Sequence, residues 1–434
     1  MLSMTELQCR VTSPAEISSA AARLRQAVFD VEASPDEVIT VLEAWGKRLD
    51  SRHLDGVPGI VFLRIWLRRG TLEPIIDREL GSGGISGGWS EYGRSNCKAF
   101  PLGVVGHWPA GNVEIQPILS MTCALLGGNA ALVRVPTALV DLTQCLIEKL
   151  VESDSRKLLT SRIFMAAFEH DRQDLHEVMA RSVDGAMIWG GQEAVLQVRA
   201  LPFPYWARLA IFGPRISVAA MDSGAWGNPH AQESWCRRIA RDVWQFDQQA
   251  CSSPQVLYLE NGAGLSISQF VQSLRLAFEA ENHAHPRQVI PAALTSAICN
   301  ARANWLLKDA SRRAFFSPGP DWTLLIGSGP DLPRPIQGKT LIVSEVANLS
   351  DPILRFDGNV QTLGLGMVDA EKEQKLASLA GERGVESIRC VTERLSEGRR
   401  DLRIRALPCQ IRVWKLDRAI HGCRREWHPV GRMP

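Results

Sequence analysis

The stretch of the chain best suited to chemistry is residues 247–255, which read DQQACSSPQ. Cys251 follows a polar step and precedes Ser-Ser-Pro, just before the strand pattern VLYLE at residues 256–260. A cysteine on a turn beside a strand is placed to attack a carbonyl carbon, because the thiolate is a nucleophile and nearby donors lower its pKa. Most cysteines are instead small buried apolar residues, so this position alone leaves both roles open.

A second stretch suited to ligand binding joins a strand pattern to a helix pattern at Trp189, Gly190 and Gly191. Glycines let the backbone approach a pyrophosphate, and a helix amino terminus favours its negative charge. A Gly-Gly pair alone is a weak signal. Residues 81–91 (GSGGISGGWSE) are also rich in glycine, but they lack the P-loop Lys-Ser/Thr ending and a GxGxxG spacing. A flexible connector is therefore the favoured interpretation of that stretch.

The elements that must position these residues start at residue 101, where short apolar runs alternate with helical patterns. Four strand patterns, each followed by a helical one, read LGVVGHW, AALVRV, RIFMAAF and GAMIWG. This order predicts an α/β fold with a doubly wound parallel sheet. Ligands of such sheets bind outside the carboxyl ends of the strands.

A second α/β unit is predicted from about Tyr205. The strand patterns ARLAIFGP and SVAAMD precede the helical pattern HAQESWCRRIARDVWQF, which leads directly to Cys251, and a further strand and helix pattern follow. Before both units, the first 53 residues hold two amphipathic helix patterns, with Ser13 and Ser34 as the expected N-caps.

Composition excludes several function classes. The 434 residues are 45% hydrophobic and 22% charged, which is typical of a globular protein with two or three domains. A net charge of +2 gives no electrostatic case for nucleic acid or an anionic membrane. No run of 18 apolar residues and no signal-peptide pattern occur, so we expect a cytoplasmic protein without a membrane span.

The ten cysteines are scattered singly, as expected for free thiols in a reducing compartment. None has zinc spacing with a histidine, so no metal site is expected. His283 and His285 read as a loop pair. His107 lies near Asn112 and could either face a cleft or belong to the core.

Five blocks of the chain, in order, resemble the acyl-CoA reductase (LuxC) family known from bacterial bioluminescence, a branch of the aldehyde dehydrogenase superfamily. The blocks read PLGVVGHWPAGNVEIQPILS, MIWGGQEAV, IFGPRIS, FDQQACSSPQ and GNVQTLGL. The resemblance covers roughly residues 55–388 and implies an aldehyde dehydrogenase-like α/β fold. The implied domains are a cofactor domain at 1–204, a catalytic domain at 205–357, a return to the cofactor domain at 358–388 and a divergent tail at 389–434.

The resemblance implies NADPH-dependent reduction of an acyl thioester to an aldehyde through an acyl-enzyme on Cys251, in a cleft between the two domains. Asn112, in the block PAGNVE, matches the asparagine whose amide stabilises the oxyanion in this superfamily, together with the Cys251 backbone N–H. Taken alone, an asparagine after glycine is usually a turn residue. The glutamate that activates water in hydrolytic relatives is missing, because the matching block, 211–214, reads IFGP. This absence favours thioester reduction over aldehyde oxidation.

The resemblance also indicates the cofactor contacts. Trp189, Gly190 and Gly191 would bind the pyrophosphate. Arg134, Pro136 and Thr137 fall where NAD-preferring relatives read Lys-Pro-Ser-Glu, and Ala138 takes the place of the glutamate that binds the ribose hydroxyls. Arg134 or Thr137 could then bind a 2′-phosphate, so NADPH is the expected cofactor. An NADH preference would instead indicate another acidic residue, such as Asp141.

Two other functions remain open: an aldehyde dehydrogenase acting in the oxidative direction, and an impaired subunit of an acyl-transfer complex. The acyl donor could be coenzyme A, a carrier protein, or an acyl-protein synthetase or acyltransferase partner, and a homo-oligomer is expected. After residue 388 the chain becomes rich in arginine and departs from the family pattern. The tail at 389–434 is either divergent or the product of a frame shift, and we expect it to be the least ordered part.

Overall fold

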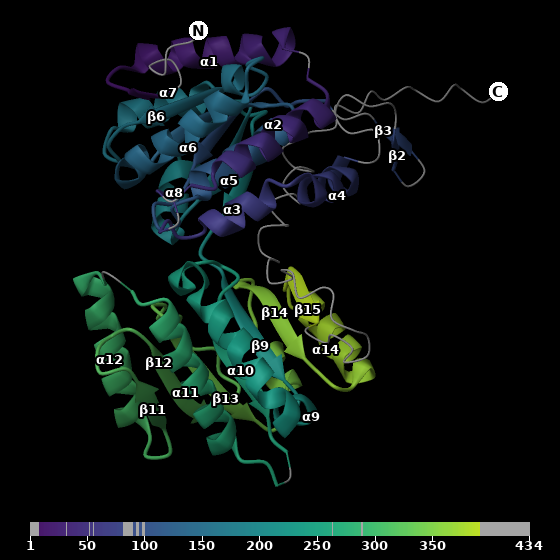
Figure 1. Ribbon diagram of the computed structural model, residues 1–434, viewed down its shortest axis with the longest axis vertical. Coiled ribbons are helices and arrows are strands. Elements are labelled where there is room, and N and C mark those ends of the chain that lie inside the picture. Colours follow the sequence, from purple (N-terminus) through teal and green to yellow (C-terminus); the bar gives the residue numbers. More distant parts are fainter. Residues whose placement is uncertain are drawn as a thin grey trace, which may run out of the picture. The chain divides into compact units, whose positions relative to one another are not determined.

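The computed structural model describes residues 8–390, except residues 32, 52, 55, 81–89, 93, 94, 98, 99, 263, 288 and 289. These residues form two compact units with a boundary between Gly213 and Pro214 (Figure 1). In the described part of the chain, no helix combines the length and the apolar character needed to cross a bilayer.

The first unit is built on a six-stranded, wholly parallel sheet. Its strands lie in the order β1 (Gln8–Arg10), β6 (Ile163–Ala167), β5 (Ala130–Val135), β4 (Val104–Trp108), β7 (Gly185–Trp189) and β8 (Arg208–Phe212). The helices that connect them are α5 (Gln116–Leu126), α6 (Val140–Ser153), α7 (Gln173–Arg181) and α8 (Gln192–Arg199). All residues of β4 and β6 are buried, as expected for parallel strands covered on both faces. The predicted doubly wound α/β fold is confirmed.

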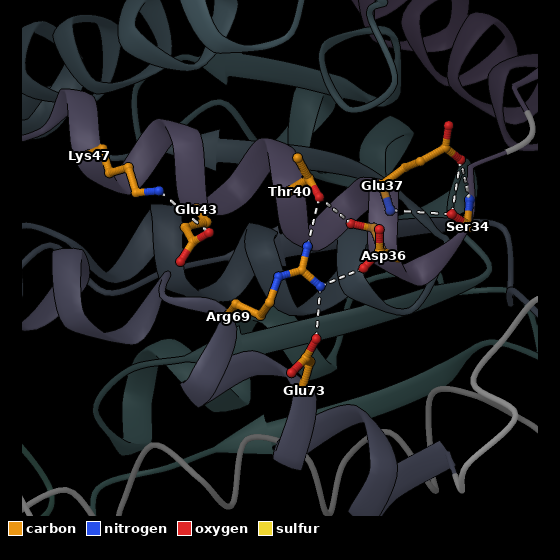
Figure 2. Close-up of polar contacts among 8 residues, drawn as sticks. All are labelled: Ser34, Asp36, Glu37, Thr40, Glu43, Lys47, Arg69 and Glu73. Atoms are coloured by element: carbon orange, nitrogen blue, oxygen red, sulfur yellow. Dashed lines mark hydrogen bonds and ion pairs between the residues drawn. The ribbon is translucent and has the colours of Figure 1, made fainter.

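The amino-terminal helices α1 (Pro14–Asp30) and α2 (Pro35–Arg48) begin where the sequence predicts. Ser34 donates its backbone N–H to Glu37 (2.9 Å) and its hydroxyl accepts the Glu37 backbone N–H (3.3 Å), which forms a capping box (Figure 2). The backbone N–H of Ser13 likewise donates to Glu16 (3.0 Å). Both predicted N-caps are confirmed.

Polar side-chain contacts join α2 to its neighbours. Arg69, the first residue of α4 (Arg69–Leu80), pairs with Asp36 and Thr40 of α2 and with Glu73 (Figure 2). Exposed pairs of this kind contribute at most about 1 kcal/mol each. The stronger attachment is Trp45, which is fully buried and donates its indole N–H to the carbonyl of Leu146 in α6 (2.9 Å). The short helix α3 (Ile60–Trp66) lies between α2 and α4 in the chain.

The second unit has a seven-stranded sheet in which only the edge strand β11 is antiparallel. The order is β11 (Arg313–Phe316), β12 (Thr323–Ser328), β13 (Thr340–Val346), β10 (Pro254–Glu260), β9 (Ile216–Met221), β14 (Val360–Gly366) and β15 (Ser387–Cys390). The helices are α9 (Ser223–Trp226), α10 (Pro229–Trp244), α11 (Ile267–Ala284), α12 (Ala292–Lys308), α13 (Ser350–Leu354) and α14 (Ala370–Glu382). All residues of β10 are buried.

The domain limits read from the sequence need two corrections. Strand β8 pairs with β7 in the first sheet, so the first unit extends to Gly213 rather than ending at residue 204. Strands β14 and β15 pair in the second sheet, beside β9, so the predicted return of residues 358–388 to the cofactor domain is wrong. An apolar strand pattern reports burial, but it carries no information about which sheet the strand joins.

Two sequence predictions fall partly or wholly on residues outside the described range. The tail was expected from residue 389, but Arg389 and Cys390 are the last residues of β15 and pair with Gly364 and Leu365. Residues 391–434 lie outside the described part of the chain, and so do residues 81–89 of the glycine-rich stretch. A two-stranded antiparallel ladder, β2 (Ser90–Tyr92) with β3 (Ser95–Cys97), follows that stretch.

Candidate active site

Cys251 lies in the second unit, on a turn at the amino end of β10, the central strand of the sheet. Helix α10 ends at Trp244 and a 3-10 helix, η4 (Gln245–Gln248), carries the chain to this turn. The cysteine is half-buried. Its carbonyl accepts the hydroxyl of Ser217, a buried residue of the adjacent strand β9 (2.5 Å). This hydrogen bond therefore connects the Cys251 backbone to the sheet.

The segment before Cys251 has an unusual backbone. Phe246, Asp247 and Gln248 follow one another in the left-handed region, with φ of 51°, 56° and 61°. This region is unfavourable for residues with a Cβ, so three in succession require support from the surroundings. We refer to residues 245–251 as the nucleophile turn.

Gln248 provides the first support of the nucleophile turn. Its fully buried side-chain amide donates to the carbonyls of Pro254 and Thr340 (2.9 Å each), and its amide oxygen accepts the backbone N–H of Thr340 (2.7 Å). One side chain thereby joins the turn to the first residue of β13, 92 residues later. Every bond involves a buried group, so losing the amide would leave buried backbone groups unpaired.

Asp247 provides the second support. Its carboxylate pairs with Arg287 (Nε, 2.8 Å) and lies 3.6 Å from Lys339 Nζ. The side chains of both cations are about 95% buried, with exposed fractions of 6% and 5%. Burial lowers the pKa of Lys339, which Asp247 raises in turn, and the ammonium lies 4.6 Å from the ring centre of Trp244. This cluster of two cations and one carboxylate stabilises the turn that carries Cys251.

Asn112 belongs to the first unit. It is exposed, in the loop that joins the carboxyl end of β4 to α5. The same loop is fixed by Gln116, whose side-chain oxygen accepts the backbone N–H of Ala110 (2.7 Å). The Asn112 amide therefore lies outside the hydrophobic core, at the carboxyl edge of the sheet, which is where sheets of this type bind ligands.

The six predicted cofactor residues all gather at this same edge. Arg134, Pro136 and Thr137 lie at the end of β5 and just after it, and Trp189, Gly190 and Gly191 at the end of β7. The chain order reverses between β4 and β7, because β5 and β6 lie on one side of β4 while β7 and β8 lie on the other. Such a switch point is where doubly wound sheets bind dinucleotides.

The amino end of α8 fits a pyrophosphate. Gly190 has φ of 156°, and a Cβ there would lie 3.1 Å from that of Ala194. Gly191 is the N-cap, and an added Cβ would meet no described atom within 4 Å, so the helix terminus is open. Trp189 stacks on Phe212 with ring centres 3.5 Å apart and donates its indole N–H to Ser120 (3.0 Å). These contacts fix the wall of the site beside the glycines.

At the end of β5, the structure shows side-chain contacts that the sequence does not indicate. The Arg134 side chain is largely buried, which lowers its pKa, and its Nε has no hydrogen-bond partner among the described residues. Its guanidinium lies 5.9 Å from the ring centre of Phe168. Thr137 is exposed and donates its hydroxyl to Glu169 (3.3 Å), a residue that sequence reasoning missed.

His107 belongs to the core of the first unit rather than to a cleft. It is fully buried in β4 with Nδ1 2.7 Å from the Ser120 hydroxyl, and burial lowers its pKa to about 3. The ring is therefore neutral at physiological pH. The described residues contain no group of three or more His, Cys, Asp or Glu side chains that could hold a metal ion.

The profile of the acyl-CoA reductase (LuxC) family matches residues 19–395. The chain belongs to this family. Similar proteins include the long-chain acyl-protein thioester reductase of Vibrio harveyi (28% identical over 191 residues) and the long-chain acyl-protein thioester reductase 2 of Photobacterium leiognathi (26% over 210). These matches cover 44% and 48% of this LuxC-family chain and 39% and 42% of the relatives. The chain thus spans about two-fifths of the length of the curated relatives it matches.

Solved structures show the fold of this family member. An NADP-dependent glyceraldehyde-3-phosphate dehydrogenase from Bacillus halodurans C-125, complexed with NADP, aligns with a TM-score of 0.65 at 15% identity, over 88% of this chain and 84% of that one. An NAD-dependent aldehyde dehydrogenase from Sinorhizobium meliloti aligns with a TM-score of 0.61 at 14% identity, over 87% and 79%. The predicted aldehyde dehydrogenase-like fold is confirmed.

Proposed function

We propose that this chain reduces an acyl thioester to an aldehyde, with Cys251 as the nucleophile and NADPH as the reductant. The observation that carries the proposal is the nucleophile turn, which holds one half-buried thiol at the amino end of a central strand. Membership of the acyl-CoA reductase family supports the same chemistry.

The first half of the reaction transfers the acyl group to the enzyme. The Cys251 thiolate attacks the thioester carbonyl, a new C–S bond forms and the carbonyl oxygen becomes an oxyanion. Collapse of this species breaks the original C–S bond, and the donor leaves as a thiolate that takes up a proton. The product is an acyl-enzyme on Cys251.

The oxyanion needs hydrogen-bond donors that are already aimed at it. We assign this role to the Asn112 side-chain amide and the Cys251 backbone N–H. The support for Asn112 is its exposure on the loop that follows β4 and its match to the family block PAGNVE. The support for Cys251 is the Ser217 hydrogen bond to its carbonyl, which connects this residue to strand β9.

When bound, the nicotinamide cofactor supplies the hydride that reduces the acyl-enzyme carbonyl. Gly190 and Gly191 would hold the pyrophosphate at the amino end of α8, beside Trp189. Arg134, Pro136 and Thr137 would line the adenosine ribose. The second oxyanion then collapses, the Cys251 sulfur leaves as a thiolate and the aldehyde is released.

Water must not compete for the acyl-enzyme. Hydrolysis requires a base beside the thioester, and the position that holds a glutamate in hydrolytic relatives is Ile211 here. Ile211 is 39% exposed and has no group that can take a proton. An enzyme that passes its acyl group to hydride benefits from this substitution.

The acyl donor is expected to be a long-chain thioester of coenzyme A, a carrier protein or a partner enzyme. The support for this assignment is that similar proteins are long-chain acyl-protein thioester reductases. We further propose an acyl-protein synthetase or acyltransferase as a partner, and a homo-oligomer as the working form.

The function is tested with a panel of acyl-CoA and acyl-carrier thioesters of increasing chain length. We expect NADPH oxidation that depends on the thioester and yields one aldehyde per NADPH, measured by absorbance at the nicotinamide band and by trapping the aldehyde. Consumption of NADPH without aldehyde, or acid formation from aldehyde as the faster reaction, would contradict the proposal.

NADPH should be used in preference to NADH, because Ala138 leaves no carboxylate at the position that excludes a 2′-phosphate in NAD-preferring relatives. Steady-state kcat/KM for the two cofactors with one acyl thioester measures the preference. Arg134→Ala should lower kcat/KM for NADPH more than for NADH, since only NADPH carries the phosphate. Equal losses for both cofactors would argue against this role of Arg134.

A further inference from the structure

A carboxylate reaches the ribose end of the proposed cofactor site from a strand that the family block does not include. Glu169 follows β6, which lies beside β5 with Ala167 opposite Val135. The Glu169 side chain is exposed, and it accepts the hydroxyl of Thr137 at 3.3 Å. The acidic group that is missing at Ala138 in the sequence is therefore supplied nearby by another part of the chain.

Glu169 also affects the pKa of Arg134. Burial lowers the pKa of Arg134, and the charge of Glu169 is the influence that opposes this shift. The guanidinium Nε has no hydrogen-bond partner among the described residues, so the arginine is not fully satisfied by the protein. A largely buried cation and an exposed carboxylate that contacts the Thr137 hydroxyl thus influence each other at the end of β5.

These two charges favour different ligands. A carboxylate accepts hydrogen bonds from the 2′- and 3′-hydroxyls of an unphosphorylated ribose, whereas an arginine accommodates a 2′-phosphate. A carboxylate also repels a phosphate, because like charges held close together destabilise each other. The balance between the two side chains decides which dinucleotide binds better.

We infer that Glu169 is a specificity-determining residue of the dinucleotide site, which supports NAD(H) through its ribose hydroxyls and limits the preference for NADP(H). The inference rests on the proposed function, since it assumes a nicotinamide dinucleotide at the carboxyl edge of the first sheet. Thr137 positions the Glu169 carboxylate, and Arg134 supplies the opposing attraction for the phosphate.

The experiment measures binding of NADP⁺ and NAD⁺ alone to the full chain by isothermal titration calorimetry. Glu169→Gln keeps the size of the side chain and an oxygen that can accept the Thr137 hydroxyl, but removes the charge. We expect the ratio of the two dissociation constants to shift towards NADP⁺ by at least about tenfold, which corresponds to about 1.4 kcal/mol. The dissociation constants of the two dinucleotides should therefore favour NADP⁺ less strongly in the wild type than in the variant.

The matched control is Glu177→Gln, which removes the same charge from a half-buried residue of α7 that pairs with Arg181. It should leave the ratio unchanged, and so separate a local effect of Glu169 from a change in net charge. Thr137→Val should move the ratio less than Glu169→Gln, because the carboxylate remains. An unchanged ratio in Glu169→Gln, or an equal shift in Glu177→Gln, overturns the inference.

The assay contains no acyl substrate, so it distinguishes the two possible failures. If the dinucleotide ratio shifts but no thioester is reduced, the role of Glu169 stands and the proposed activity falls. If thioesters are reduced and the ratio does not shift, the activity stands and the role of Glu169 falls. Failure of the wild-type chain to bind either dinucleotide overturns both.

Discussion

Replacing Cys251 with alanine should abolish thioester reduction and the covalent adduct that precedes it. Loss of the nucleophile in enzymes with an acyl-enzyme typically lowers kcat by roughly 10⁴–10⁶-fold. With acyl thioester and no cofactor, the intact mass of the wild-type chain should rise by one acyl group, and peptide mapping should place it on Cys251. Cys251→Ala should show neither the adduct nor the reduction.

Other cysteines provide the control for this experiment. Cys236 is a buried core residue of α10, and burial raises the pKa of its thiol to about 12, so it should not react. Cys299 is exposed on α12 and could be acylated without any catalytic role. Cys299→Ala should therefore keep both the adduct and the activity. A Cys251→Ala chain that reduced substrate at a comparable rate would show that the nucleophile lies elsewhere.

Asn112→Ala should lower kcat by ~10²–10³-fold, the usual cost of losing one oxyanion donor. The residue is exposed on a loop, so the thermal midpoint should change little and the defect should be catalytic. Its KM for the thioester should remain within a few-fold of the wild type, because the donor is needed mainly in the transition state.

Asn112→Asp sharpens the test, since it preserves size but places a negative charge where the oxyanion forms. Its kcat should fall further than that of the alanine variant, and the difference should shrink at low pH as the carboxyl group is protonated. Substrate titration with both variants separates the alternatives. A change confined to KM would indicate a binding role for Asn112 rather than stabilisation of the oxyanion.

Much of the first unit could be predicted from sequence because its strands are short, apolar and bounded by turn residues. The patterns LGVVGHW, AALVRV, RIFMAAF and GAMIWG coincide with β4, β5, β6 and β7. The same signals could not assign β14 to a sheet. Its apolar residues are buried against β9 and β15, but the choice of partner depends on the whole second unit.

The supports of the nucleophile turn could not be predicted for a related reason. Asp247 pairs with Arg287 at a separation of 40 residues, and Gln248 bonds to Thr340 at a separation of 92. Neither partner stands in a recognisable motif. Glu169 could not be predicted either, because it follows β6 and lies outside the block after β5 that contains Ala138 and Asp141. Contacts across neighbouring strands depend on register, which composition and periodicity do not supply.

The bond between Gln248 and Thr340 has a consequence for synthesis on the ribosome. The chain grows from its amino end, so Gln248 emerges 92 residues before its partner Thr340. At roughly 5–20 residues per second, this interval lasts about 5–20 s. Strand β13 is also the parallel neighbour of β10, so the central strand lacks one partner throughout the same interval. The nascent chain therefore acquires the geometry of this turn late, only when β13 joins the sheet.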